Sequence, residues 1–573
     1  MQSLVPRIVQ RPIPQIADTL LNSIPSLLRR IYLARGIRTE KELDLRLCHL
    51  LPPHNLDGVT AAANLLAYTI ANKKHITVIG DYDADGATAS ALSVLILKAL
   101  GGCKVDFLIP NRFTMGYGLA PELVEQAASN GSDLIMTVDS GITSFAGIAK
   151  AQELNLPVII TDHHLPSGTL PHAHAIVNPN IPGNSFIAKH TAGVGVAFYL
   201  MAVLRRLIQP NFDIAAYLDL VALGTVADLV PLDYNNRILV NHGLQRIRTG
   251  KCRPGITALL QVAKRQANRV TAQDLAFTVG PRLNAAGRLT DMQLGIECLL
   301  CDDLKQALEY ATALQELNQE RRAIENQMQK QAMSVLDGIV LDGELPYGLC
   351  LYDENWHQGV IGILASRLKE LYQRPVIALA LSEAGIVKGS ARSIPEIHIR
   401  DLLADINSRY PNMLLRYGGH AMAAGLTLNL SMLSAFQKVF EATVYRYLDG
   451  TLPGAEIVTD GCLHKSEMNI DMARLLRYAG PWGQGFPPPL FEGRFRIVSQ
   501  YLVGKVHLKL KLEMESEYKT NQYSNIASID AIAFHWGESL VESEWIYIVY
   551  QLDVNEYMGQ ETPQLIVEHL QPI

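Results

Sequence analysis

The stretch Gly80-Asp81-Tyr82-Asp83-Ala84-Asp85-Gly86 places three carboxylates at alternate positions between two glycines. Residues 75–79 before it are β-branched and predict a buried strand, and residues 87–100 after it are rich in Ala, Leu and Ser and predict a helix. The acids therefore stand where a strand ends and a helix begins, which is where ligands bind in open α/β sheets. Because carboxylates this close repel one another, the stretch predicts either a divalent metal site or a solvated acidic turn.

Two further predicted strands also end in polar residues. Residues 133–138 lead into Asp139-Ser140-Gly141, and residues 157–160 lead into Thr161-Asp162-His163-His164. With a strand at 105–109 and a helix at 146–154, this region predicts a parallel sheet with helices on both faces.

Acids and imidazoles at three strand ends are expected to meet at one edge of that sheet. Taken singly, Asp139 could cap a helix and a histidine could be an ordinary packed residue. Together, Asp83, Asp85, Asp139 and His163 form a mixed carboxylate and imidazole set that suits Mn²⁺, or Mg²⁺ with waters. Asp228 follows an apolar helix within Gly224–Leu232 and needs either a metal or an arginine partner if it is buried.

Composition limits the broader class. A chain of 573 residues is too long for one core and predicts three or four domains. The net charge of −6 argues against a uniformly basic nucleic-acid binder but is compatible with a local basic groove. Seven scattered cysteines, with the pair Cys298 and Cys301 interpreted as core residues, predict a reduced, cytoplasmic protein. We find no signal peptide, no run that could span a bilayer, and no Walker loop, zinc-protease helix or nucleophile elbow.

The ordered motifs resemble the DHH phosphoesterase family, and within it the RecJ type of single-strand-specific exonuclease. The resemblance covers most of the chain and rests on five segments and on residues 109–118. The five are Asp81–Gly86, Val138-Asp-Ser-Gly141, Asp162-His-His164, the Asp228 segment and Val279-Gly-Pro-Arg-Leu-Asn-Ala-Ala-Gly-Arg288.

This resemblance implies a two-metal phosphodiesterase acting on single-stranded DNA. One ion is expected on Asp83 and Asp139 with Asp81, and the other on Asp85, Asp139, His163 and Asp228, so that Asp139 bridges. Asp162 is expected to orient an imidazole, and His164 to bind phosphate or act as an acid. The groups expected to contact nucleotide and phosphate are Arg112, Tyr117, Arg282, Asn284 and Arg288.

Residues 303–337 predict a long amphipathic helix, because apolar residues recur at three- and four-residue steps. The pattern is too short and broken for a coiled coil, so we interpret it as a spacer. Residues 340–450 then predict a second α/β unit with strands at 348–352 and 376–381 and a helix at 359–371. Within it, groups suited to a phosphate resemble the family's substrate-binding signatures: Ser390, Arg392, Gly418, Gly419 and His420. Arg392 could instead pair with Glu396 and steady its loop.

The C-terminal part predicts an all-β unit. Strands are expected at 491–500, 502–512, 529–535 and 546–550, with Lys505, Lys509 and Lys511 among them. This pattern is typical of an OB-type barrel, which holds single strands by stacking and charge, although a purely structural barrel is the alternative. Because every predicted metal ligand precedes residue 229, we expect this barrel to be separable from the catalytic centre.

The resulting prediction is a multidomain α/β protein. Its parts are an N-terminal helical wrap (1–50), a DHH catalytic domain (51–302), a connecting helix (303–338), a DHHA1-like domain (339–453) and an OB-fold-like domain (454–573). The family implies 5′ to 3′ digestion to mononucleotides in bacterial DNA repair and recombination, with two Mn²⁺ or Mg²⁺ ions. It also implies a monomer that works with a helicase and a single-strand-binding protein and does not bind a membrane. The alternatives are a phosphoesterase of small substrates and an inactive single-strand-binding scaffold.

Overall fold

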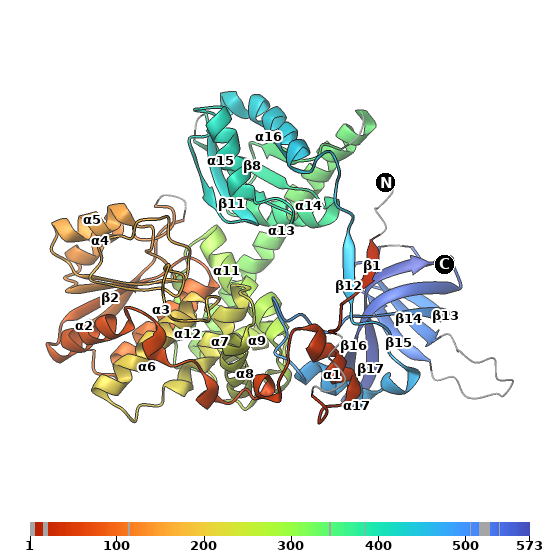
Figure 1. Ribbon diagram of the computed structural model, residues 1–573, viewed down its shortest axis with the longest axis horizontal. Helices are drawn as coiled ribbons and strands as arrows, with labels where there is room; N and C mark the ends of the chain where they lie inside the picture. The colour runs from red at the N-terminus through yellow and green to blue at the C-terminus, as the bar shows by residue number, and fades with distance from the viewer. Residues whose placement is uncertain are drawn as a thin grey trace. The chain divides into compact units, whose positions relative to one another are not determined.

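The computed structural model describes residues 6–14, 21–102, 104–112, 115–342, 345–383, 385–504, 506–514, 528–537 and 539–573 (Figure 1). The chain forms two compact units. One contains Gln315–Ile457 with Met1–Arg7 and Arg288–Thr290, and the other contains Ile8–Gly287, Asp291–Leu314 and Val458–Ile573. In the described residues no helix is both long and apolar enough to cross a membrane.

The larger unit is built on a five-stranded parallel sheet in the order β3-β2-β4-β5-β6. Strands β2 and β4 are buried along their whole length, as expected of continuous β-branched and apolar runs covered on both faces. The parallel arrangement confirms the predicted fold class, and it brings the ends of β2, β4 and β5 to one edge. The strands are β2 (His75–Ile79), β3 (Lys104–Leu108), β4 (Leu134–Val138), β5 (Val158–Thr161) and β6 (Ala175–Val177).

Helices cover both faces of this sheet, as Figure 1 shows. Helices α4 and α5 pack on one face through a shared apolar cluster that includes Leu123, Ile148 and Ile160. Helices α3 and α6 pack together and contact the sheet, and α2 contacts both α6 and β6. Their bounds are α2 (Val59–Ala71), α3 (Ala84–Ala99), α4 (Pro121–Ser129), α5 (Phe145–Glu153) and α6 (Gly193–Ile208).

A helical region follows the sheet in the same unit. Helix α7 is buried over nearly its whole length and packs against both α3 and α8, so it delivers Asp228 from the protein interior. The helices are α7 (Leu218–Ala227), α8 (Tyr234–Arg248), α9 (Pro254–Val262), α10 (Ala272–Asp274), α11 (Gly280–Leu289), α12 (Gln293–Leu300) and the long helix α13 (Leu304–Asp342). The end of α11, from Arg288, and the part of α13 from Gln315 belong to the smaller unit.

The smaller unit is a second α/β structure, as predicted. Its sheet has the order β10-β11-β9-β8-β7, with only β7 and β8 parallel. One face carries a core with α15 and α16, and the other carries a core with α14 and the later part of α13. The elements are β7 (Leu349–Asp353), α14 (Ile361–Tyr372), β8 (Val376–Glu383), β9 (Ile386–Arg392), α15 (Ile399–Arg409), β10 (Arg416–Gly419), β11 (Ala423–Asn429) and α16 (Leu433–Tyr447).

The C-terminal strands close into a barrel in the order β13-β14-β15-β17-β16, confirming the predicted OB-type architecture. Several strand bounds differ from the prediction, and β16 continues to Tyr557. Leu502 and Val503 end β13, because the chain turns before β14, and the last strand β17 was not predicted. Lys505 lies outside the described residues. The strands are β13 (Phe491–Val503), β14 (His507–Met514), β15 (Ile529–Ala533), β16 (Trp545–Tyr557) and β17 (Gln560–Pro572).

The barrel is not a detached module. Arg35, just after α1 (Ser26–Ala34), forms a buried, two-pronged ion pair with Asp460 at 2.8 and 2.9 Å. Leu490 N also donates to Asp460 at 3.0 Å, which ties this carboxylate to the entry of β13. β1 (Arg7–Gln10) pairs with β12 (Glu456–Thr459), and α17 (Ile470–Tyr478) packs on β16. The expected separability of the barrel from the catalytic domain therefore has to be revised.

Candidate metal centre and phosphate site

The acidic turn between β2 and α3 is set by Asp83. This residue is the N-cap of α3, and its Oδ1 accepts hydrogen bonds from Asp85 N at 2.9 Å and Gly86 N at 3.0 Å. A side chain at Gly86 would lie 2.7 Å from the Asp81 backbone, so the tight turn requires glycine there. The turn keeps Asp81, Asp83 and Asp85 at the end of β2.

Asp139 follows β4 in a left-handed conformation, with φ of 58°, which costs free energy for a residue other than glycine. A Cβ at Gly193 would lie only 2.5 Å from Asp139 Oδ1, so the first residue of α6 has to be a glycine for this carboxylate to fit. The same helix start donates to Asp85, from Gly193 N at 2.6 Å and Val194 N at 2.9 Å. This support was not predicted, and glycines 193 and 195 were the available indication of it.

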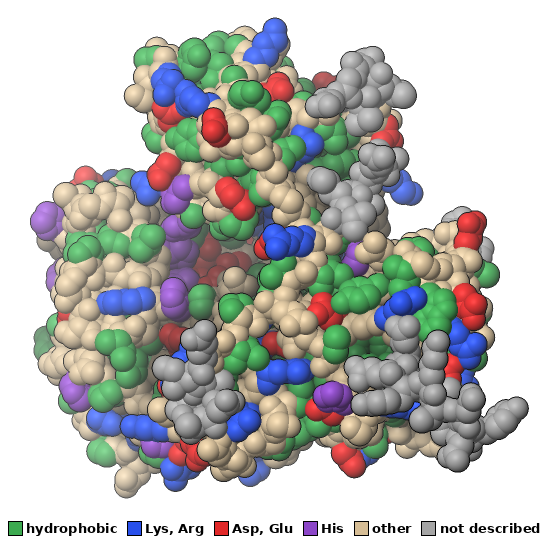
Figure 2. Space-filling view, turned by 45° about the vertical axis from the view of Figure 1, so that its right-hand side comes forward, with side chains coloured by type: hydrophobic (Ala, Val, Ile, Leu, Met, Phe, Trp, Pro, Cys, Tyr) green, Lys and Arg blue, Asp and Glu red, His purple; other side chains and the backbone are tan. Residues whose placement is uncertain are grey.

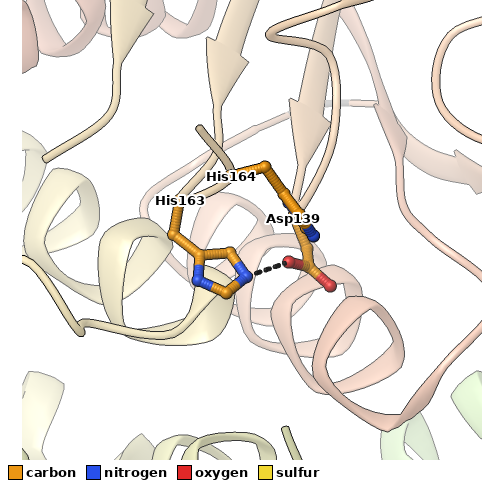
Figure 3. Close-up of side chains that lie close together, drawn as sticks. All are labelled: Asp139, His163 and His164. Atoms are coloured by element: carbon orange, nitrogen blue, oxygen red, sulfur yellow. Dashed lines mark ion pairs between the residues drawn. The ribbon is translucent and has the colours of Figure 1, made fainter. Parts of the chain in front are cut away.

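His163 joins the acids from the end of β5. Its Nε2 lies 3.0 Å from Asp139 Oδ1, 3.5 Å from Asp228 Oδ2 and 3.9 Å from Asp85 Oδ2. Figure 3 shows its ring directed at the Asp139 carboxylate, with His164 beside it. Three groups of side chains have ligand atoms close enough to hold an ion: Asp81 with Asp83 and Asp139, Asp85 with His163 and Asp228, and Asp139 with His163 and His164.

The electrostatics of this cluster favour a cation. Burial, followed by repulsion from Asp83, raises the pKa of Asp85 to about 7. Burial and the neighbouring carboxylates likewise raise the pKa of Asp139 and of Asp228 well above the ordinary value. Asp81 Oδ1 is buried and has no hydrogen-bond partner among the described residues. A metal ion would relieve both the repulsion and the unpaired oxygen, so the residues present fit a divalent cation.

Asp162 holds the second imidazole. It is fully buried, and its Oδ1 lies 2.7 Å from His164 Nδ1 while its Oδ2 accepts from Ile142 N at 2.9 Å. Burial acts to raise the pKa of Asp162, but the contacts with the two histidines outweigh it and lower the pKa. In return, Asp162 outweighs the effect of burial on His164 and raises its pKa to about 9. A protonated His164 suits an anionic ligand.

Tyr117 and Arg112 lie beside this cluster. Tyr117 Oη is 2.9 Å from His164 Nδ1 and donates to the Asp139 carbonyl at 3.1 Å. The Arg112 guanidinium lies 4.8 Å from the ring centre of Tyr82, whose ring meets Tyr117 edge-on. The two predicted substrate residues therefore stand next to the acids and to an aromatic ring.

Two other predicted contacts lie in α11. Asn284 Oδ1 accepts from Ala84 N at 2.8 Å, which fixes the first turn of α3. Arg282 is largely buried and donates to the Thr278 carbonyl. The observed bond of Asn284 gives it a structural task that the sequence motif did not indicate.

The smaller unit gathers the predicted phosphate groups on β9 and the start of α14. Arg392 donates to Ser390 Oγ at 2.9 Å, Ser366 Oγ at 3.1 Å and the Ala391 carbonyl at 2.8 Å. A Cβ at Gly362 would lie 3.0 Å from both Arg392 Nη2 and Ser390 Oγ, so the helix start approaches them closely. These contacts hold the Arg392 guanidinium beside Ser390 and the start of α14.

The remaining predicted groups flank this cluster in the same unit. Gly418 and Gly419 lie in β10, and Gly419 has φ of 142°, which favours glycine. His420 N donates to the Ala423 carbonyl at 2.8 Å, which closes the turn between β10 and β11. Arg288 donates to the Gly359 carbonyl at 3.2 Å, just before α14. Backbone amides, glycines and two arginines thus belong to one α/β unit.

Figure 2 shows where histidine, acidic and basic side chains are exposed on one face of the molecule. On the face seen in Figure 2, several histidine side chains lie in a row beside acidic side chains. Blue basic side chains are scattered among other groups on that face, in keeping with the net charge of −6. Charge is therefore organised locally, as acids grouped beside histidines.

A parallel sheet that presents acids and histidines at its strand ends, together with a second α/β domain and a barrel, defines a DHH-type phosphoesterase architecture. Comparison with known families agrees: the DHH family N-terminal domain matches residues 75–225, the DHHA1 domain 345–446 and the RecJ OB domain 459–569. The chain belongs to the RecJ family.

Relatives cover the chain almost completely. It is 48% identical to the single-stranded-DNA-specific exonuclease RecJ of Escherichia coli over 98% of this chain and 99% of that protein. It is 46% identical to the Haemophilus influenzae RecJ over the full length of both. The crystal structure of Thermus thermophilus RecJ in complex with Mn²⁺ matches with a TM-score of 0.81 and 30% identity, covering 100% of this chain and 80% of that one. A structure of the same protein with Mg²⁺ gives 0.76.

Proposed function

We propose that this protein is a metal-dependent exonuclease that hydrolyses single-stranded DNA from the 5′ end and releases mononucleotides. Full-length similarity to RecJ exonucleases supports the nuclease activity and the single-strand substrate. The metal-bound RecJ structures and the buried acids support dependence on Mn²⁺ or Mg²⁺. The observation that carries the proposal is the cluster of carboxylates at 3.0, 3.5 and 3.9 Å from His163 Nε2, which belong to Asp139, Asp228 and Asp85, since carboxylates held this close to one another favour a bound cation.

In this proposal Asp81, Asp83 and Asp139 hold one ion, and Asp85, Asp139, His163 and Asp228 hold the other. Two ions held this way lower the pKa of an attacking water and offset charge on the phosphate. Asp139 belongs to both sets, so its strained backbone fixes the two sites relative to each other. The amides of Gly193 and Val194 orient Asp85, and Asp162 orients the histidine pair.

His164 has a separate task. Held protonated by Asp162 and contacted by Tyr117, it presents a cation beside the metal ligands. There it can bind a non-bridging phosphate oxygen or give a proton to the departing 3′ oxygen. Arg112 and Tyr82 supply a neighbouring planar surface for a nucleotide.

The 5′ end is assigned to the smaller unit. Arg392, preset by Ser390 and Ser366, offers a planar fork to a terminal phosphate, and the start of α14 offers amides. A terminal phosphate carries more charge than an internal one, so this group can recognise an end. Arg288, Gly418, Gly419 and His420 complete the proposed pocket.

Incubation with Mn²⁺ and 5′-labelled oligonucleotides tests the proposal. Release of labelled mononucleotide from single-stranded DNA, and loss of release with EDTA, is the expected result. Binding without cleavage would indicate a scaffold, and cleavage restricted to dinucleotides or pyrophosphate would indicate a small-substrate phosphoesterase. Either outcome would overturn the exonuclease assignment.

A further inference from the structure

A tight turn in the C-terminal part, residues 482–486, is a rigid element. Gly483 N donates to the Phe486 carbonyl at 2.9 Å, and Phe486 N donates back at 3.1 Å. The rings of Trp482 and Phe486 stack with centroids 5.1 Å apart, and Trp482 Nε1 donates to the Leu476 carbonyl at 2.8 Å. Gly485 has φ of 70°, so glycine suits the apex. We call this element the aromatic turn.

The aromatic turn is anchored in the catalytic part of the same unit. The Tyr32 ring lies 6.2 Å from that of Trp482, and the Arg35 guanidinium lies 5.4 Å from the Trp482 ring. On the other side, the buried Arg237 of α8 places its guanidinium 4.4 Å from the Phe486 ring. Cation–π contacts of this kind are strongest where water is excluded. The turn is thus held between α1 and α8.

The aromatic turn touches the loop that follows Asp228. Leu232 N donates to the Gln484 carbonyl at 2.7 Å. A Cβ at position 483 would lie 2.7 Å from Leu232 Cδ1, and one at 485 would lie 3.1 Å from Pro231 Cβ. Leu232 is 3% exposed, so its side chain has little room to move away. The two segments fit closely along their length.

That loop begins directly after Asp228. Asp228 closes the last turn of α7, and Leu229 directly after it is left-handed with φ of 59°. The chain therefore reverses at the proposed ligand, and its path is fixed by the next contacts, at Pro231 and Leu232. Asn236 donates to the Pro231 carbonyl at 2.9 Å from α8, and the aromatic turn holds Leu232 from the opposite segment.

We propose that the aromatic turn positions Asp228 for metal binding and so couples the C-terminal part of the chain to the catalytic centre. This inference rests on the proposed function of Asp228 as a metal ligand. It assigns Gly483 and Leu232 as positioning residues that contact neither metal nor DNA. The C-terminal part then contributes to turnover itself, in addition to any DNA that its barrel holds. Substituting a residue that orients a metal ligand commonly lowers metal affinity or activity about 10- to 100-fold.

The test is Gly483→Ala, which presses a methyl group on the Leu232 side chain. Calorimetric titration of the full-length protein with Mn²⁺ should show weaker binding, by about tenfold, at one of its sites. Turnover of a 5′-phosphorylated dinucleotide, which gains little from an extended binding surface, should fall in kcat. A variant defective only in holding DNA would instead keep Mn²⁺ affinity and dinucleotide kcat and would raise KM on long strands.

Rescue separates positioning from general damage. Adding Leu232→Val to Gly483→Ala shortens the colliding side chain by about the methyl group that was added and should recover part of the Mn²⁺ affinity. Gly454→Ala is the matched control, because nothing lies within 4 Å of its Cβ. Should Gly483→Ala fail to fold, Leu232→Val reports on the same contact with a smaller loss. Unchanged Mn²⁺ affinity and dinucleotide kcat in folded Gly483→Ala or Leu232→Val, with an active wild type, would overturn the inference. An inactive wild type would instead overturn the proposed function.

Discussion

The metal centre and the phosphate site differ in how their charged side chains are held before a ligand binds. At the ends of β2, β4 and β5, the pKa values of the carboxylates rise because burial disfavours their charged form and because each repels the others. At β9 and α14, Arg392 is already held by Ser366, Ser390 and a backbone carbonyl. The first site is incomplete until cations arrive, whereas the second is arranged in advance. Removing a group should therefore affect stability with opposite sign at the two sites.

The largest expected effect is that of Asp139→Asn. The carboxylate is shared by both proposed metal sets, and metal stabilisation supplies several kcal/mol, so hydrolysis should fall by about 10³-fold or more. Without metal, the variant should melt at a higher temperature than wild type, because one repelling charge is gone. Single-turnover digestion and calorimetry with EDTA measure the two. Asp219→Asn, a buried acid outside the cluster, should keep turnover. Near-normal hydrolysis by Asp139→Asn would remove this residue from the site.

The second effect is the pH dependence of the metal-free protein. Folding raises the pKa of Asp85 from 3.8 to about 7, so the native state retains a proton that the unfolded state has released. Stability from this group is full below about pH 4 and is lost as pH rises through 7, by a few kcal/mol. Denaturant unfolding at several pH values with EDTA should show this fall, and saturating Mn²⁺ should oppose it. A metal-free stability that rises between pH 5 and 7 would contradict the assigned repulsion.

A smaller effect is expected at the arranged site. Arg392→Lys keeps the charge but loses the planar fork, so the preference for 5′-phosphorylated over 5′-hydroxyl DNA should drop about tenfold in kcat/KM. Mn²⁺ binding should be unchanged. Arg409→Lys, an exposed arginine of α15, serves as control. If wild type prefers the phosphate and Arg392→Lys keeps the same ratio, Arg392 does not read the 5′ end.

The smallest effect concerns the barrel surface. Tyr501 on β13 is 57% exposed and offers a ring to a base. Stacking contributes about 1–3 kcal/mol per base, so Tyr501→Ala should raise KM on long single strands about fivefold and leave kcat unchanged. Tyr68→Ala, equally exposed on α2, should change neither. A KM equal to that of wild type would favour the purely structural barrel.

Much of the fold was predictable because its determinants are local. Runs such as residues 75–79 and 134–138 are short, apolar and β-branched, and each is followed directly by its functional residues. The supports of the site were not predictable, because they come from far along the chain. Gly193 donates to Asp85 over 108 residues, and Asn284 accepts from Ala84 over 200.

The errors in the barrel have the same origin. Leu502 and Val503 are apolar and β-prone, so pattern alone joined them to the following strand, whereas the chain turns after them. The sequence does not indicate the contact between Leu232 and the aromatic turn, because Gln484 contributes its backbone carbonyl, which any residue carries. A sequence pattern consists of side chains, so it cannot indicate a hydrogen bond that is made by the main chain.

The buried pair of Arg35 and Asp460 also bears on how the protein is made. The partners are 425 residues apart, so a ribosome adding about 5–20 residues per second leaves Arg35 waiting roughly 20–85 seconds. During that time Tyr32 of α1 has neither the Trp482 ring nor the Phe486 ring to pack against. The N-terminal segment therefore completes its packing only when synthesis is nearly finished.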